Sequence, residues 1–141
     1  QYIIGNTKFY DLDFVVDERV FIPRPETELL VQKAIDVAYS LQLIAYSLRM
    51  LDLCTGSGNI AIALMLRLRS ASMLSNAEAL TKNIAGCKMV ASDISDDALR
   101  VARQNAESHG VSDRIEFVNS DLFQDIAGEF DIIATNPPYI A

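Results

Sequence analysis

A short apolar segment, a glycine turn and a longer apolar segment follow one another directly, and this order constrains the fold most. The run at 50–54 (MLDLC) predicts a buried strand, 55–58 (TGSG) a turn, and 60–68 a buried helix. Gly56 and Gly58 permit positive φ and a close approach of the backbone to a ligand. Such a unit holds ligands at the carboxyl end of the strand, against the helix N-terminus. It does not identify the ligand, because a dinucleotide turn of the form G-x-G-x-x-G/A and an ordinary tight turn both fit.

Further strands and helices alternate after this unit. Apolar runs predict strands at 88–93, 115–118 and 130–135. Ser95 is placed to cap a helix that Gly110 ends. Strands that alternate with helices predict an α/β fold with a parallel sheet covered on both faces.

The ends of the chain suggest how it is organised. Residues 1–25 are expected to form a β-hairpin, with its turn at 5–6, followed by a linker. Residues 26–141 are expected to form the N-terminal part of an α/β domain that begins with a helix. Residues 70–87 resemble an insertion. Because the chain stops six residues after the strand at 130–135, we interpret it as a piece of a larger protein.

Composition excludes several classes of protein. The chain has 141 residues, 12 basic and 19 acidic, for a formal net charge of −7, which disfavours binding nucleic acid through many phosphate contacts. No apolar run approaches the roughly 18 residues of a membrane span. The two cysteines and single histidine fit neither a zinc site nor a disulfide framework, so we expect no metal and a cytoplasmic location.

Carboxylates follow the second and third predicted strands of the sheet. Asp93 ends one strand, where a carboxylate can accept both hydroxyls of a ribose, as nicotinamide and S-adenosylmethionine sites both require. Asp121 follows the next strand, where it could accept from an adenine amino group while Leu122 packs against the ring. Their matched placement favours a nucleoside-containing cofactor and leaves both cofactors possible.

The sequence NPPY at 136–139 follows the fourth strand directly. A planar amide or exocyclic amine nitrogen is a poor nucleophile because its lone pair is delocalised. The Asn136 carboxamide and the Pro137 carbonyl can both accept hydrogen bonds from such an NH2 group, and Tyr139 offers a surface for stacking. Pro137 and Pro138 restrict the loop, so the group is oriented before reaction. The motif therefore predicts transfer of a methyl group to a planar nitrogen.

Three segments together resemble the HemK/PrmC family of protein-glutamine methyltransferases: FIPRPETE at 21–28, LDLCTGSG at 51–58 and NPPYI at 136–140. The resemblance implies a Rossmann-like class I methyltransferase fold. It also implies S-adenosylmethionine as cofactor, S-adenosylhomocysteine as product and a class I peptide-chain release factor as partner. The acceptor would be the glutamine of the Gly-Gly-Gln loop. Because NPPY also occurs in nucleic-acid amino-methyltransferases, a nucleobase acceptor stays open, as does a fragment that binds cofactor without turnover.

The resemblance also implies roles for individual residues. The segment 23–27 would close over the cofactor. The predicted cofactor residues comprise the glycines under the methionine part, the residues supporting their loop, the ribose carboxylate and the adenine pair: Gly56, Gly58, Asp52, Thr55, Asp93, Asp121 and Leu122. The predicted glutamine-binding residues are Asn136, Pro137, Pro138 and Tyr139, with Asn136, Pro137 and Tyr139 acting in catalysis.

The family's strand order, 3-2-1-4-5-7-6, gives one more expectation. It would make the strand at 130–135 an interior strand, which here lacks a partner on one side. We therefore expect the isolated chain to be marginally stable or to associate through this edge.

Overall fold

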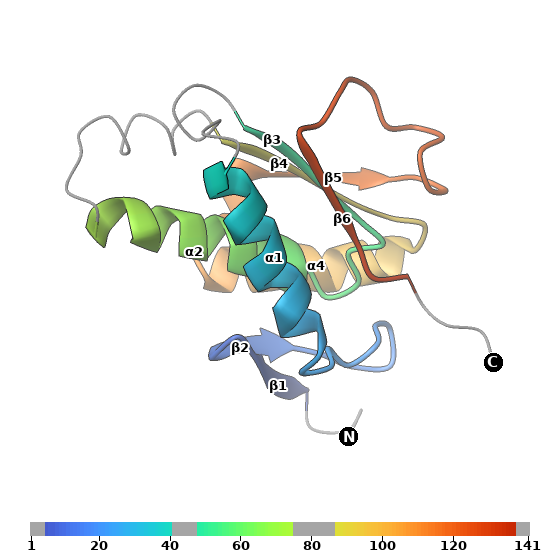
Figure 1. Ribbon diagram of the computed structural model, residues 1–141. Coiled ribbons are helices and arrows are strands. Elements are labelled where there is room, and N and C mark those ends of the chain that lie inside the picture. The colour runs from blue at the N-terminus through green and yellow to red at the C-terminus, as the bar shows by residue number, and fades with distance from the viewer. Residues whose placement is uncertain (1–4, 41–47, 75–86, 138–141) are drawn as a thin grey trace.

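The structure is a computed structural model that describes residues 5–40, 48–74 and 87–137, with the backbone alone for 69–74. Its centre is a parallel four-stranded sheet in the order β5-β4-β3-β6 (Figure 1). The strands are β3 (Arg49–Leu53), β4 (Lys88–Asp93), β5 (Ile115–Asn119) and β6 (Ile132–Thr135). When these four strands are numbered by their order along the chain, their order across the sheet is 3-2-1-4, which is the order that the resemblance implies.

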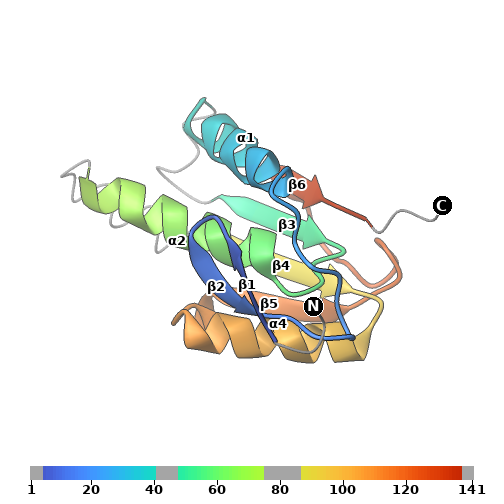
Figure 2. The same ribbon diagram turned by 90° about the horizontal axis from the view of Figure 1, so that it is seen from below.

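Three helices lie side by side on one face of this sheet (Figure 2). They are α1 (Thr27–Ser40), which packs near β6, α2 (Asn59–Leu74), and α4 (Asp96–Ser108), which packs near β5. A 3-10 turn, η2 (Ser112–Arg114), leads into β5. As expected, Ser95 caps α4, accepting from the backbone N–H of Ala98 at 3.1 Å, and Gly110 follows its end with φ of 72°.

The other face of the sheet is covered as expected, although not by a helix in the described part of the chain. In the described part of the chain it is covered by the connection 120–131, which passes over the sheet opposite the helices (Figure 1). Ile126 and Phe130 of this connection pack on the buried side chains of Leu51 and Val90. Arg49 holds the end of this connection. The backbone N–H of Asp131 donates to the carbonyl of Arg49 at 2.8 Å, and the Asp131 carboxylate accepts from the backbone N–H of Arg49 at 2.9 Å. The Arg49 guanidinium also lies 5.0 Å from the Phe130 ring centre.

A β-hairpin precedes the domain, formed by β1 (Asn6–Phe9) and β2 (Leu12–Val15). The turn expected at 5–6 is wrong: Asn6 opens β1, and the turn lies at Tyr10 and Asp11, with φ of 54° and 62°. Two positive φ values in a two-residue loop are typical of a type I′ turn, which asparagine and glycine usually provide. Contacts with the helices hold this one, since Arg67 stacks 4.6 Å from the Tyr10 ring centre.

Asn105 of α4 joins this hairpin to the glycine turn. Its side chain exchanges hydrogen bonds with the backbone N–H and C=O of Val15, at 2.6 and 3.0 Å, and donates to the carbonyl of Ser57 at 2.9 Å. Asn105 is buried, and so are Phe9 and Phe14 of the hairpin, which pack against the helical layer. The hairpin is therefore anchored to the layer that carries the site.

The remaining boundaries differ in detail from the expectations. The first predicted strand ends at Leu53, because Cys54 has φ of 63° and belongs to the turn, and β6 begins two residues later than predicted. Helix α2 runs on to Leu74, into the segment interpreted as an insertion, and 75–86 lie outside the described residues. Within the described ranges, no helix is long and apolar enough to cross a membrane.

Candidate functional site

A cleft of about 1250 Å³ opens where the parallel strands end. Its walls come from the turn after β3, the ends of β4 and β6, the loop after β5, and the segment 19–27 that leads into α1. The volume exceeds the 300–1,000 Å³ typical of a single small-molecule pocket. The cleft therefore has room for a cofactor and for part of a second reactant.

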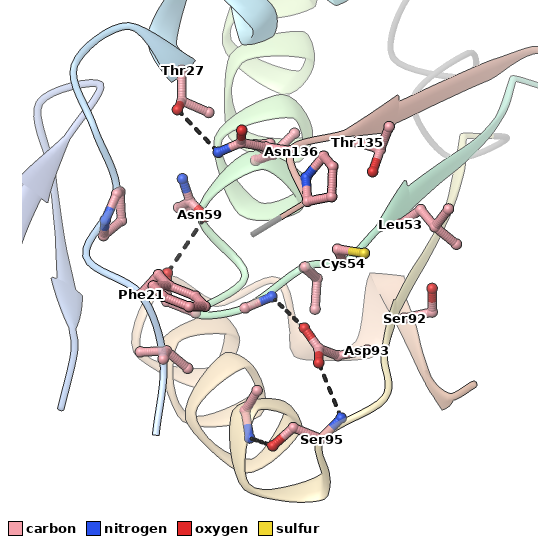
Figure 3. Close-up of a pocket in the computed structure, with 18 of the residues that line it drawn as sticks. Phe21, Thr27, Leu53, Cys54, Asn59, Ser92, Asp93, Ser95, Thr135 and Asn136 are labelled. Atoms are coloured by element: carbon pink, nitrogen blue, oxygen red, sulfur yellow. Dashed lines mark hydrogen bonds between the residues drawn. The ribbon is translucent and has the colours of Figure 1, made fainter. Parts of the chain in front are cut away.

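Asp93 connects two walls of this cleft. Its Oδ2 accepts a 2.9 Å hydrogen bond from the backbone N–H of Gly56, and its Oδ1 accepts one of 3.0 Å from the N–H of Ser95 (Figure 3). Each carboxylate oxygen has two acceptor sites, so one on each oxygen remains for a ligand. A rigidly held carboxylate with two remaining acceptor sites suits the adjacent hydroxyls of a ribose.

The two glycines of the turn have different surroundings. Gly56 has φ of +56° and open space where a Cβ would stand, and it lines the cleft. Gly58 has φ of +84°, and its Cβ would lie 3.1 Å from both Ala102 Cβ and Ile62 Cδ1. Gly58 does not border the cleft. The first glycine leaves room for a ligand, and the second lets the turn pack against α4.

Asp52 lies behind the turn and does not border the cleft. It is fully buried, and its Oδ2 accepts from Thr55 Oγ1 at 2.7 Å and from the backbone N–H of Ala61 at 3.2 Å. Oδ1 has no partner in the described part of the chain. Burial raises the pKa of this carboxyl to about 7, although the two hydrogen bonds act against that rise. Asp52 thus supports the turn and the start of α2 from below.

The loop after β5 brings Asp121 and Leu122 to the cleft. Leu122 has φ of 51°, and its carbonyl accepts a 2.8 Å hydrogen bond from Ser120 Oγ, which fixes this bend. Leu122 and Ile94, which follows Asp93, both line the cleft and are more than half exposed. Exposed apolar side chains beside a polar carboxylate provide surface for a flat aromatic ring. Ile94 was not among the residues predicted to contact the cofactor, although its position directly after Asp93 could have indicated that it lines the cleft.

Asn136 and Pro137 come to the cleft directly after β6. The Asn136 Nδ2 donates a 3.2 Å hydrogen bond to the hydroxyl of Thr27 (Figure 3). Its Oδ1 accepts no hydrogen bond from any residue that the structure describes. Pro138 and Tyr139 lie outside the described residues.

In the segment 23–27, the residues that border the cleft are Pro23, Arg24, Glu26 and Thr27, and Phe21 just before it borders the cleft too. Phe21 is among the residues that line the cleft, and its side chain is 70% exposed (Figure 3). This segment was predicted to close over the cofactor, without any of its contacts being specified. The Thr27 hydroxyl could not be predicted as the partner of Asn136, because no local sequence pattern pairs two residues that are 109 positions apart.

Cys54 also lines the cleft. Burial and the nearby Asp93 carboxylate raise the pKa of its thiol, which makes the thiolate scarce. This favours a structural role for Cys54 over a nucleophilic one. Within the described ranges, no three His, Cys, Asp or Glu side chains are grouped so as to hold a metal ion.

Comparison with known proteins identifies similar chains. Residues 44–141 match the family model described as RMKL-like, methyltransferase domain. A release factor glutamine methyltransferase of Chlorobaculum tepidum is 47% identical over 146 residues, which cover 99% of this chain and 44% of that protein.

Solved structures give the same fold. A ribosomal protein L11 methylase from Lactobacillus delbrueckii subsp. bulgaricus superposes with a TM-score of 0.57 at 26% identity, covering 86% of this chain and 51% of that one. An RNA methyltransferase from Salinibacter ruber, in complex with S-adenosyl-L-homocysteine, gives 0.52 at 27% identity over 82% of this chain and 60% of that one. The chain spans less than half the length of the curated relatives it matches.

Proposed function

Since this chain belongs to the family of RMKL-like methyltransferase domains, we propose that it methylates the side-chain amide nitrogen of a glutamine in a peptide-chain release factor. The observation that carries the proposal is that Asp93 and Asn136 line one cleft. The first is suited to a nucleoside cofactor and the second to a planar NH2 group. The proposed location of this reaction is the cytoplasm.

The residues around the turn fit S-adenosylmethionine as cofactor. Open space at Gly56 leaves room beside the backbone, and the remaining acceptor sites of Asp93 suit the ribose hydroxyls. Ile94 and Leu122 offer apolar surface for adenine, and Asp121 lines the same cleft, where its carboxylate would accept from the adenine amino group. When bound, this cofactor supplies an electrophilic methyl group on a sulfonium. Its product would be S-adenosylhomocysteine.

Asn136 and Pro137 would orient the acceptor. The Asn136 Oδ1 and the carbonyl of Pro137 can accept the two N–H bonds of a glutamine side-chain amide. Acceptance of both hydrogens favours pyramidal character at nitrogen, so that its lone pair becomes available for attack on the methyl group. The two-proline sequence restricts the backbone, and the orientation is therefore settled before reaction. The methylated nitrogen then loses its proton to solvent.

Two features favour a protein glutamine over a nucleobase. The curated relatives that match nearly the whole chain at 37–47% identity are named release factor glutamine methyltransferases. The formal net charge of −7 also disfavours a nucleic-acid backbone as partner. By the family resemblance, the acceptor is the glutamine of the Gly-Gly-Gln loop of a class I release factor.

Radiolabelled methyl transfer tests the proposal. The complete protein that contains these residues is offered release factor, DNA and RNA in parallel, with labelled S-adenosylmethionine. We expect label in the release factor and none in either nucleic acid. Label in DNA or RNA alone would reject the glutamine assignment in favour of an amino group on a base. Titration calorimetry with S-adenosylhomocysteine and NADH tests the cofactor separately, and binding of NADH alone would reject the methyltransferase assignment.

A further inference from the structure

The contact between Asn136 and Thr27 joins two segments that lie far apart in the chain. Thr27 is the first residue of α1, and its hydroxyl oxygen accepts from Asn136 Nδ2 at 3.2 Å across 109 residues. Thr27 is only 7% exposed, whereas Asn136 is exposed to the cleft. A buried hydroxyl therefore meets the donor side of an exposed carboxamide.

Thr27 itself is held firmly. Its backbone N–H donates to the carbonyl of Arg24 at 3.0 Å, and Pro23 and Pro25 restrict φ on either side of that residue. Helix α1, which begins at Thr27, packs beside β6, the strand that leads into Asn136, so the two elements are held together. The branched side chain of threonine is also restricted at χ1. The hydroxyl is thus a fixed partner for a side chain that extends from a strand end.

A carboxamide carries a donor on one side and an acceptor on the other. With Nδ2 bonded to Thr27, Oδ1 is the atom left to meet an incoming NH2 group, and it has no partner in the described residues. A carboxamide free to rotate would also present its own NH2 group, which cannot accept from a substrate amide. The contact therefore removes rotations of Asn136 that would be unproductive.

We propose that Thr27 is a positioning residue, whose hydroxyl holds the Asn136 carboxamide with Oδ1 toward the acceptor amide. This role rests on the proposed function, because it assumes that Asn136 receives an NH2 group. Thr27 acts through Asn136 and touches neither reactant in this role.

Paired substitutions in the complete protein test the role. Thr27→Val keeps the shape and removes the hydroxyl, Thr27→Ser keeps the hydroxyl, and Thr7→Val makes the same change on the distant hairpin. We expect Thr27→Val to lower kcat for methyl transfer about three- to tenfold, the range of one neutral hydrogen bond. Thr27→Ser and Thr7→Val should stay within about twofold of the unchanged protein, and S-adenosylhomocysteine affinity should not change in any variant.

Two results would overturn the role. One is an unchanged kcat for Thr27→Val, and the other is an equal loss in Thr27→Ser, which would assign the effect to packing of the methyl group. If Thr27→Val fails to fold, as its thermal melt would show, Thr27→Ala replaces it with the same expectation.

A second measurement is independent of any substrate. NMR of the Asn136 side-chain amide, assigned by its disappearance in Asn136→Ala, should show slow proton exchange in the unchanged protein and in Thr27→Ser. Exchange should be faster in Thr27→Val. Equal exchange in all three proteins would overturn the inference even if methyl transfer is observed. Absence of methyl transfer by the unchanged protein would instead reject the proposed function. The hydrogen bond between Thr27 and Asn136 would still be tested by the NMR measurement.

Discussion

The backbone N–H of Gly56 donates a 2.9 Å hydrogen bond to Oδ2 of Asp93, although 37 residues separate them. The turn after β3 and the carboxylate at the end of β4 are therefore parts of one unit. Parallel pairing of these strands, with Leu53 opposite Ser92, brings the two strand ends to the same level. A change in Asp93 should consequently affect both the ligand and the turn.

Asp93→Ala should weaken S-adenosylhomocysteine binding on the order of tenfold to a hundredfold. The loss corresponds to about 1.5–3 kcal/mol for hydrogen bonds to a charged group. Asp97→Ala is the control, because Asp97 is an exposed carboxylate of the same region whose salt bridge is with the exposed Arg100. Titration calorimetry measures both variants, and equal affinities for the two would contradict the role of Asp93.

The two glycines of the turn should respond differently to alanine. Gly56→Ala should lower the free energy of unfolding by roughly 1–2 kcal/mol, the cost of a left-handed conformation with a Cβ. Gly58→Ala adds overpacking against Ala102 and Ile62, so its loss should be roughly 2–4 kcal/mol. Chemical denaturation compares them. A larger loss for Gly56→Ala would show that the packing described for Gly58 is incorrect.

Asp52 should make stability depend on pH. Burial raises the pKa of its carboxyl from 3.8 to about 7, so between these values the folded protein holds a proton that the unfolded chain releases. The contribution of Asp52 is full below about pH 4 and is lost as the pH rises through 7, on the order of a few kcal/mol.

Asp52→Asn cannot titrate and should flatten this part of the profile. Urea denaturation from pH 4.5 to 8 is measured for both proteins, and the difference between their profiles isolates Asp52 from other carboxylates, such as Asp17, whose pKa is lowered by Arg19. Parallel profiles would mean that Asp52 is ionised in the folded protein throughout this range.

Asn136→Ala should abolish methyl transfer, with a fall of about a hundredfold or more, the scale seen when one hydrogen-bonding group that acts on the reacting centre is removed. Cofactor affinity should stay within a few-fold, because Asn136 lies apart from the carboxylate and the turn. Asn6→Ala, on the exposed start of the hairpin, is the matched control. A loss of cofactor affinity equal to the loss of rate would assign Asn136 to the cofactor instead.

Local patterns in the sequence predicted much of this fold. The strand at 88–93, the cap at Ser95 and the glycine after α4 all appear where local chemistry placed them. These features depend on neighbouring residues, so the sequence reveals them. Asp93 and Asn136 were also predictable as cleft residues, because the carboxyl ends of parallel strands meet at one edge of a sheet.

Features that depend on distant contacts were not predictable. The turn at Tyr10 and Asp11 lacks the usual residues and is held by Arg67 from α2. The connection 120–131, which covers the second face of the sheet, is held by the contact of Phe130 with Arg49, a residue far away in the sequence. The partner of Asn136 is Thr27, which no spacing rule pairs with it. Each of these contacts joins residues that are more than 50 positions apart in the sequence, so no local pattern reveals it.

Tandem mass spectrometry of a release factor after reaction identifies the residue that receives the methyl group. The release factor is incubated with the complete protein and S-adenosylmethionine, digested, and its peptides sequenced. The account predicts one added methyl group on the glutamine of the Gly-Gly-Gln loop, and none when Asn136→Ala replaces the unchanged protein. A methyl group on any other residue, or an unmodified glutamine beside a methylated nucleic acid, would contradict it.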